Sequence, residues 1–206
     1  LDKIFFKYHI DFDSLIVKEN TAAICVSRPT NPTGNVLSDY EMQKLLSIAE
    51  QNEIPLIIDS AYGEPFPNII FTKTKPFWNE STIFCMSLSK IGMPGVRTGI
   101  VIAADSIINS IRNMNAVINL AIANFGPMIA NDLVRTGEIL ELARLEINPF
   151  YKRKLEHALK SIQRKFEGID YYIHTPQGAI FLWLWLPNLP ISSDALYDRL
   201  KSKGVL

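Results

Sequence analysis

The sequence predicts an α/β protein with a largely parallel sheet. Apolar runs alternate with a helical segment and with long loops along residues 22–104, which is the order expected of this fold class. The runs are continuously apolar, as is typical of strands buried on both faces of a sheet. Polar side chains follow the ends of three runs, at the edge where open sheets of this kind bind ligands. A site at one rim of the sheet is therefore expected.

The first part of the chain is expected to hold four strands and one helix. The helix follows Ser38, which fits a capping box with Glu41 and precedes apolar residues at helical spacing. Before it, two prolines stiffen the loop at residues 28–35 and give Asn31 a well-defined direction. The strands are expected at residues 22–27, 54–58, 82–86 and 99–103.

From residue 105 onward the pattern becomes mostly helical. A helix is expected to start at Asp105 and to end before a break at residues 124–127. Residues 128–166 continue the helical pattern, with a kink or a boundary at Pro149. A smaller sheet and a last helix complete the expectation, with strands at residues 171–174 and 179–186 and the helix from near Ser193 to before Gly204.

Charge and hydropathy exclude several classes of protein. Lysine plus arginine and aspartate plus glutamate number 21 each in 206 residues, so no bulk charge favours nucleic acid or an acidic membrane surface. The longest strongly apolar run, residues 179–186, is too short to cross a bilayer, and no signal peptide is visible. We therefore expect a soluble, cytoplasmic protein with no nucleic-acid or membrane partner.

The cysteines and the ends of the chain carry two further expectations. Cys25 and Cys85 both lie in apolar runs, which favours small buried side chains in a reducing compartment over a disulfide or a metal site. The three histidines are scattered without the spacing of metal ligands. The sequence opens without methionine and stops in an apolar run, so we treat it as a segment of a longer protein.

The strongest candidate for chemistry is Lys90, in a turn that follows the third expected strand. Burial beside a strand end lowers the pKa of a lysine and frees its amine to form a Schiff base. Ser87, Ser89 and Arg97 surround it in sequence, and hydroxyls with a guanidinium can bind a phosphate group. On its own, the tetrapeptide is more often a turn with a solvated lysine.

Three more candidates follow other strand ends. Asp59 could keep a pyridine nitrogen protonated, and Asn31 and Tyr62 could donate hydrogen bonds to a phenolate oxygen. Each has an ordinary alternative, because an aspartate caps loops, an Asn-Pro pair forms turns and a tyrosine packs. All of them in this order, on separate strand ends, favour one shared site.

These motifs resemble those of the fold-type I pyridoxal-phosphate-dependent aminotransferases. The resemblance is carried by Ser-Arg-Pro-Thr-Asn-Pro-Thr-Gly-Asn, by Asp-Ser-Ala-Tyr, and by Ser-Leu-Ser-Lys with Pro-Gly-Val-Arg-Thr-Gly. Within that group the sequence is most similar to the valine–pyruvate aminotransferase family. The similarity runs along the full chain, and the wider stretches that carry it are residues 25–36, 62–71, 85–102 and 178–185.

The resemblance implies a cofactor, pyridoxal 5′-phosphate, and a role for each candidate. Lys90 would form the Schiff base with the cofactor and then move the proton of the substrate Cα. The implied cofactor-binding set is Asp59 for the pyridine nitrogen, Asn31 and Tyr62 for the 3′-oxygen, and Ser87, Ser89 and Arg97 for the phosphate. The implied substrates are an amino acid such as valine or alanine and a 2-oxo acid such as pyruvate.

The resemblance also implies an architecture. Residues 1–140 would be the C-terminal part of the large cofactor-binding domain. Residues 141–206 would be an interdomain helix and the beginning of the small domain. The spacing from Lys90 to Arg97 is one residue shorter than in most of the superfamily, as suits the valine–pyruvate group. The glycine-rich phosphate loop and the carboxylate-binding arginine of the superfamily fall outside the stretch that this chain resembles. The family's homodimer would form in the full-length protein.

Two alternatives to this function stay open. The chain could be a catalytically incomplete fragment that retains only the scaffold. It could also serve another pyridoxal-phosphate reaction on amino acids, such as β-elimination, because the residues that hold the cofactor are shared.

Overall fold

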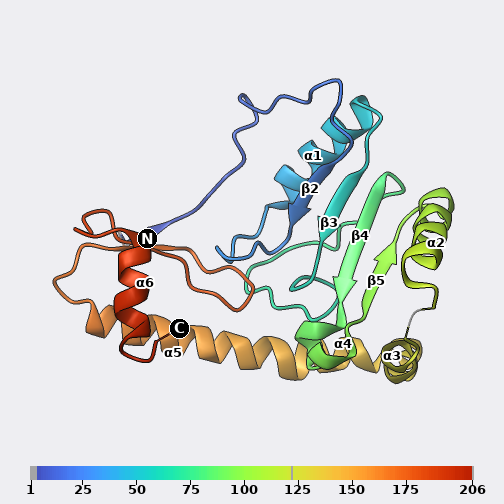
Figure 1. Ribbon diagram of the computed structural model, residues 1–206. Coiled ribbons are helices and arrows are strands. Elements are labelled where there is room, and N and C mark those ends of the chain that lie inside the picture. The colour runs from blue at the N-terminus through green and yellow to red at the C-terminus, as the bar shows by residue number, and fades with distance from the viewer. Residues whose placement is uncertain (1–3, 122, 206) are drawn as a thin grey trace.

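A four-stranded sheet organises the first half of the molecule (Figure 1). The computed structural model describes residues 4–121 and 123–205. The strand order is β2-β3-β4-β5; β2, β3 and β4 run parallel, and β5 runs antiparallel to β4. The predicted α/β class and the largely parallel sheet are thus confirmed. The strands are β2 (Ile24–Ser27), β3 (Leu56–Asp59), β4 (Thr82–Ser87) and β5 (Gly99–Ile102).

Helices pack on one face of this sheet, and α5 extends past it along the lower edge of Figure 1. Two short 3₁₀ helices, Leu88–Ile91 and Pro94–Val96, lie between β4 and β5. A π-helical turn, Ala143–Ile147, joins α4 to α5, the long helix that runs along the lower edge of Figure 1. The α-helices are α1 (Asp39–Gln51), α2 (Asp105–Asn119), α3 (Phe125–Thr136), α4 (Glu138–Leu142), α5 (Asn148–Lys165) and α6 (Ser193–Lys201).

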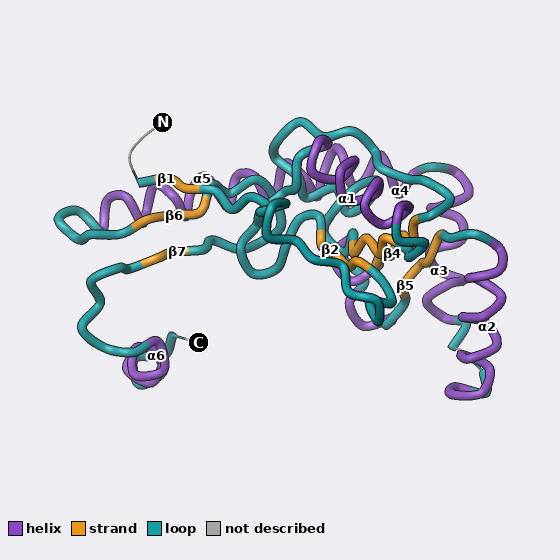
Figure 2. Tube along the Cα trace, turned by 90° about the horizontal axis from the view of Figure 1, so that it is seen from above, coloured by secondary structure: helices purple, strands orange, loops and turns teal. Residues whose placement is uncertain are grey.

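A second, smaller sheet lies near the C-terminal end of α5. Its order is β1-β6-β7, where β1 (Phe5–Phe6) is parallel to β6 (Tyr172–His174), and β7 (Leu184–Trp185) is antiparallel to β6. The view from above shows this sheet and α6 at one end of an elongated molecule, with the large sheet and α2 toward the other (Figure 2). The pairing of β1 with β6 brings a segment near the start of the chain beside residues 172–174, which the sequence pattern did not indicate.

Helix α1 begins as the sequence predicts. The Ser38 hydroxyl accepts a hydrogen bond from the Glu41 backbone N–H at 3.2 Å, and Glu41 Oε2 accepts from the Ser38 N–H at 2.7 Å. The apolar face of α1 then packs on the large sheet, where Met42 and Leu45 meet Leu56 in one core cluster. Buried Arg28 ties the preceding loop to this helix through an ion pair of 2.6 Å with Asp39.

The large sheet is buried on one face only, which corrects the expectation drawn from its continuous apolar runs. Along β4 buried residues alternate with half-buried ones, and β3 follows the same period. The burial predicted for both cysteines is wrong for the same reason, because Cys25 is exposed and Cys85 is half-buried on the uncovered face. Period-two burial is the ordinary result when helices pack on a single side.

Two predicted boundaries also differ from the structure. The break expected at residues 124–127 ends at Asn124, because α3 begins at Phe125 and takes Gly126 and Pro127 into its first turn, where proline is tolerated. The strand expected over residues 179–186 is reduced to β7. Pro149 does mark a boundary, since it lies in the first turn of α5. Within the described residues, no helix is both long and apolar enough to cross a bilayer.

Candidate active site

The candidate site lies where β2, β3 and β4 end, on the uncovered face of the sheet. Ser27 and Asp59 are the last residues of β2 and β3 and are paired in register. Asp59 is exposed; its Oδ2 accepts a hydrogen bond from Ser27 Oγ at 3.4 Å and its Oδ1 accepts from the Ala61 N–H at 3.0 Å. These two bonds fix the orientation of the carboxylate. Sequence reasoning missed Ser27, although the parallel register of two neighbouring strand ends was a signal for it.

Lys90 is placed by a short helical turn directly after β4. Ser87 caps that turn, because its Oγ accepts a hydrogen bond from the Ser89 N–H at 3.1 Å. The buried side chains of Leu88 and Ile91 anchor the turn in the core on the other side. Consequently the half-buried Lys90 faces away from the core.

Tyr62 lies beneath the lysine. Lys90 Nζ is 5.4 Å from the centroid of the Tyr62 ring, within the range of a cation–π contact. Tyr62 is 8% exposed, and Phe181 packs edge-on against it with the ring centroids 5.5 Å apart. Phe181 comes from the segment that joins β6 to β7 of the small sheet, so that segment supports the floor of the site. It belongs to the run predicted as a strand, and its role was not foreseen.

Arg97 completes the group around Ser89. Its Nη1 donates hydrogen bonds to Ser89 Oγ at 3.3 Å and to the Pro94 carbonyl at 3.2 Å. The backbone of Arg97 has φ 48° and ψ 45°, the left-handed region that most side chains avoid. The strained backbone of this turn thus places the guanidinium beside Ser89.

Contacts therefore connect six of the seven predicted site residues into three small groups. Asp59 stands with Ser27, Tyr62 with Lys90, and Ser87 with Ser89 and Arg97. Asn31 lies in the exposed turn at residues 31–33, and the hydrogen bonds between described residues do not join its side chain to these groups.

Cys85 borders the site between Asp59 and β5. It is paired in register with Asp59 on one side and with Val101 on the other. Burial raises the pKa of the Cys85 thiol, and the negative charge of Asp59 raises it further. The thiol is therefore a poor nucleophile at neutral pH.

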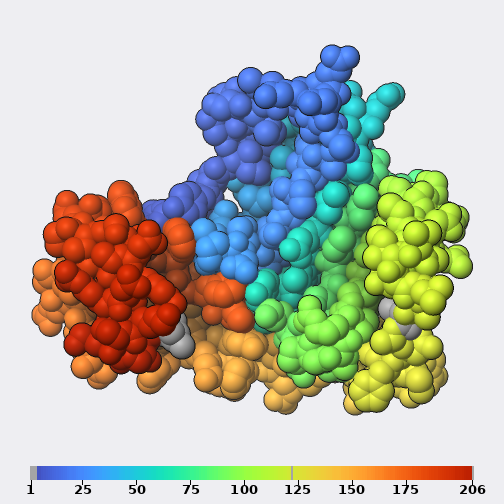
Figure 3. Space-filling model, in the orientation of Figure 1, coloured from blue at the N-terminus to red at the C-terminus, as the bar shows by residue number. Residues whose placement is uncertain are grey.

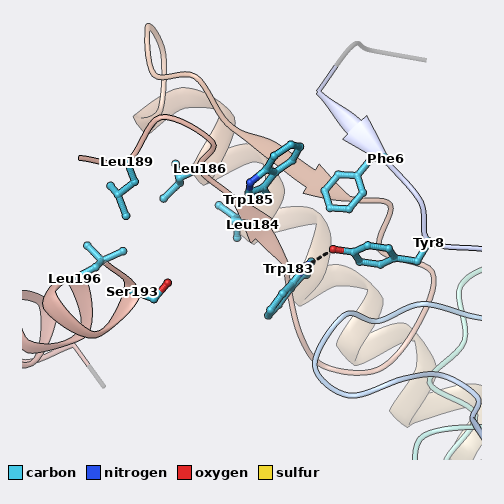
Figure 4. A pocket seen from close by; sticks show the side chains of 9 residues that line it. All are labelled: Phe6, Tyr8, Trp183, Leu184, Trp185, Leu186, Leu189, Ser193 and Leu196. Atoms are coloured by element: carbon cyan, nitrogen blue, oxygen red, sulfur yellow. Dashed lines mark hydrogen bonds between the residues drawn. The ribbon is translucent and has the colours of Figure 1, made fainter. Parts of the chain in front are cut away.

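A separate cavity lies between the small sheet and α6 (Figure 4). Its volume is ≈ 580 Å³, and Phe6, Tyr8, Trp183 and Trp185 form its aromatic wall. Trp183 Nε1 donates a hydrogen bond to the Tyr8 hydroxyl at 3.3 Å. None of the predicted site residues lines this cavity.

The mixed sheet that carries these groups of site residues at its strand ends has the fold of the fold-type I aminotransferases. The family model described as aminotransferase class I and II matches residues 3–206, and the chain belongs to this family. The fold alone is shared with the aspartate aminotransferase of Thermus thermophilus, at a TM-score of 0.80 and 18% identity over 92% of this chain and 49% of that one.

Two valine–pyruvate aminotransferases are much more similar to this chain. The protein from Escherichia coli K12 is 50% identical over 201 residues, which are 98% of this chain and 48% of that protein. The crystal structure of the enzyme from Salmonella typhimurium LT2 superposes with a TM-score of 0.95 at 50% identity, over 100% of this chain and 53% of that one. The chain thus spans about half the length of the relatives it matches.

Proposed function

We propose that the chain forms the central, cofactor-binding part of an aminotransferase of the valine–pyruvate type. The reaction moves an amino group between an amino acid such as valine or alanine and a 2-oxo acid such as pyruvate. The observation that carries the proposal is the 50% identity to valine–pyruvate aminotransferases over almost the whole chain. The homodimer, the cytoplasmic location and the division into domains at residues 140 and 141 belong to the same proposal.

The described side chains fit pyridoxal phosphate, the cofactor that this family implies. An amine can bond to its aldehyde, a fixed carboxylate can pair with its pyridine nitrogen, and a guanidinium with two hydroxyls can bind its phosphate. Lys90, Asp59 and the group of Ser87, Ser89 and Arg97 supply these functions in turn. The residues proposed to bind the phosphate are already in contact without it, because Arg97 Nη1 donates a hydrogen bond to Ser89 Oγ.

Each of these residues contributes to the reaction. The bound cofactor supplies an electron sink for the pair of electrons left on the substrate Cα. Lys90 acts as the general base that takes the Cα proton and returns it, and the Tyr62 ring beneath it restricts where Nζ can move. Asp59 keeps a positive charge at the pyridine nitrogen, and its bonds to Ser27 and Ala61 hold the carboxylate in place. Asn31 and Tyr62 are proposed to donate hydrogen bonds to the 3′-oxygen.

The test is a titration of the purified chain with pyridoxal phosphate, followed by borohydride reduction and peptide mapping. One adduct per chain on Lys90, lost in Lys90→Ala and kept in Lys160→Ala, is the expected result, because Lys160 is an exposed lysine on α5. Valine should then convert the bound cofactor to its amine form, and pyruvate should reverse the change.

Other outcomes separate the alternatives. Adducts scattered over surface lysines would mean that the chain is a scaffold without a working site. With serine in place of valine, whose Cβ hydroxyl can leave, release of ammonia and a 2-oxo acid without the amine form would favour elimination over transamination.

A further inference from the structure

The segment at residues 4–10, here called the strap, links the two sheets (Figures 1 and 2). At its start, β1 pairs with β6 in the small sheet. At its end, the Ile10 N–H donates a hydrogen bond to Glu41 Oε1 at 3.1 Å, on the helix that covers the large sheet. In the space-filling view it crosses from the C-terminal lobe, in red, toward the upper part of the molecule (Figure 3). The strap therefore contacts both halves of the protein.

Lys7, in the middle of the strap, uses all three of its N–H donors. Nζ donates to Asn35 Oδ1 at 2.7 Å, to the Val36 carbonyl at 2.9 Å and to Gln177 Oε1. All three acceptors are neutral. Burial lowers the pKa of Lys7, and the charge of Glu41 opposes that effect. These three acceptors require a donor at this position, because an apolar side chain in place of Lys7 would leave three polar groups without a hydrogen-bond donor.

Two of these acceptors belong to the loop that carries Asn31. The side chain of Asn35 is buried, and its Nδ2 also donates to the Tyr8 carbonyl at 3.3 Å. The Asn35 carbonyl accepts from the Thr30 N–H at 2.8 Å, and the Thr30 carbonyl accepts from the Gly34 N–H at 2.8 Å. These bonds close the turn over Asn31 at its base. Lys7 holds that base from outside.

The third acceptor belongs to the segment that joins β6 to β7 of the small sheet. The Gln177 N–H donates to the Gly34 carbonyl at 3.3 Å, and a Cβ on Gly34 would lie 2.8 Å from the Gly178 carbonyl oxygen. Gly34 therefore lets the two backbones approach closely. Three residues further along, Phe181 packs on Tyr62.

We propose that Lys7 is a positioning residue, which clamps the turn carrying Asn31 against residues 177–178 and so aims Asn31 at the site. The proposal rests on the proposed function for the role of Asn31. The clamp itself is defined by bonds between residues of this chain. It assigns a task in the site to a lysine that is far from Lys90 in the sequence and outside the family motifs.

The first test measures the clamp without cofactor, by amide hydrogen exchange of Lys7→Met and of Lys18→Met. Lys18 is an exposed lysine whose side chain bonds to none of these groups, so it is a matched control. Faster exchange is expected in peptides covering residues 28–37 and 175–181 of Lys7→Met alone, with α1 unchanged. Equal exchange in both variants would overturn the clamp.

The second test asks whether Lys7 acts through Asn31. Lys7→Met should weaken pyridoxal phosphate binding about tenfold, which corresponds to ~1.4 kcal/mol, and the same change in an Asn31→Ala background should have little further effect. An equal loss in both backgrounds would reduce Lys7 to a structural role. Gln177→Leu, which removes one acceptor, answers the same question if Lys7→Met fails to fold.

The two proposals fail in different ways. A wild-type chain that takes up no pyridoxal phosphate at Lys90 would overturn the proposed function and the role of Asn31 with it. The exchange experiment would still decide whether Lys7 holds the turn.

Discussion

Arg97 shows at the scale of one residue how stability and binding compete. Its left-handed backbone conformation, φ 48° and ψ 45°, costs on the order of 1 kcal/mol for a side chain of this kind. Asparagine tolerates this region far better. An arginine in this strained conformation is expected where its guanidinium binds a ligand. The proposed phosphate contact is such a ligand contact.

The substitution Arg97→Asn separates the two effects. We expect the free energy of unfolding to stay level or rise by a few tenths of a kcal/mol, because the strain is relieved. The dissociation constant for pyridoxal phosphate should rise at least about tenfold, since a charged phosphate contact is removed. Urea unfolding and a cofactor titration measure the two quantities. A stability loss above about 1 kcal/mol would mean that the bonds to Ser89 and Pro94 matter more for the fold than for binding.

At the scale of one element, α1 depends on its first turn. Ser38 and Glu41 satisfy each other's backbone N–H groups, and Glu41 also accepts from Ile10 in the strap. The cap therefore joins the helix start to the segment that crosses between the sheets. Helix α6 begins with a simpler cap, a single bond from the Ala195 N–H to Ser192 Oγ at 3.2 Å, and it buries no residue.

We expect Ser38→Ala to lower the free energy of unfolding by about 1 kcal/mol, the usual effect of losing such a cap. Ser192→Ala should cost clearly less, because the end of α6 can fray without exposing a core. Chemical unfolding of both variants, followed by far-ultraviolet circular dichroism, gives the comparison. Equal losses would contradict the coupling of the α1 cap to the rest of the molecule.

The order of elements could be predicted from the sequence, and the reasons are local. The Ser38 capping box and the apolar spacing of Met42 and Leu45 are readable without tertiary contacts, and both are confirmed. Gly126 and Pro127 were misread as a break, because proline also suits the first turn of a helix. The pairing of β1 with β6 joins residues far apart in sequence, and a two-residue strand carries no periodicity that could announce it.

The candidate site divides in the same way. Motif order predicted Asp59, Lys90 and Arg97, and the structure puts Lys90 over Tyr62 and Arg97 beside Ser89. Their catalytic roles stay predictions. Lys7 and Phe181 could not be found from sequence, because each acts through a contact with a residue on another element.

At the scale of the whole molecule, the large sheet has one covered and one uncovered face. Ile57 and Ile83 lie on the uncovered face next to Cys25. Their apolar side chains led to the prediction that this face is buried, but the described residues do not bury it. Asp59 and Ser87 open onto the same face. The site is therefore accessible to solvent in this chain, and a bound cofactor would cover part of the face.

Thiol alkylation can measure this exposure. Cys25 is expected to react first, because it is exposed, whereas the half-buried Cys85 has a raised pKa. The thiolate of Cys85 is the reactive form, so its rate should climb at a higher pH than that of an ordinary cysteine. Saturating pyridoxal phosphate should slow Cys85 further, because a bound cofactor would cover part of the uncovered face. Mass spectrometry of iodoacetamide-treated chain over a pH series distinguishes the two cysteines. Equal rates at every pH would contradict the described burial.

The antiparallel turn from β4 to β5 has a consequence for how the family can vary. Ser87 pairs with Gly99, so residues 88–98, with Lys90 and Arg97 among them, form a loop closed by neighbouring strands. The entropy of closing a loop changes slowly with its length, so adding or removing one residue there costs little. Because the strand pairing lies outside the loop, such a change leaves the register intact. Insertions and deletions between the lysine and the arginine should thus be tolerated by the fold. Such changes would alter the proposed phosphate site while the sheet stays the same.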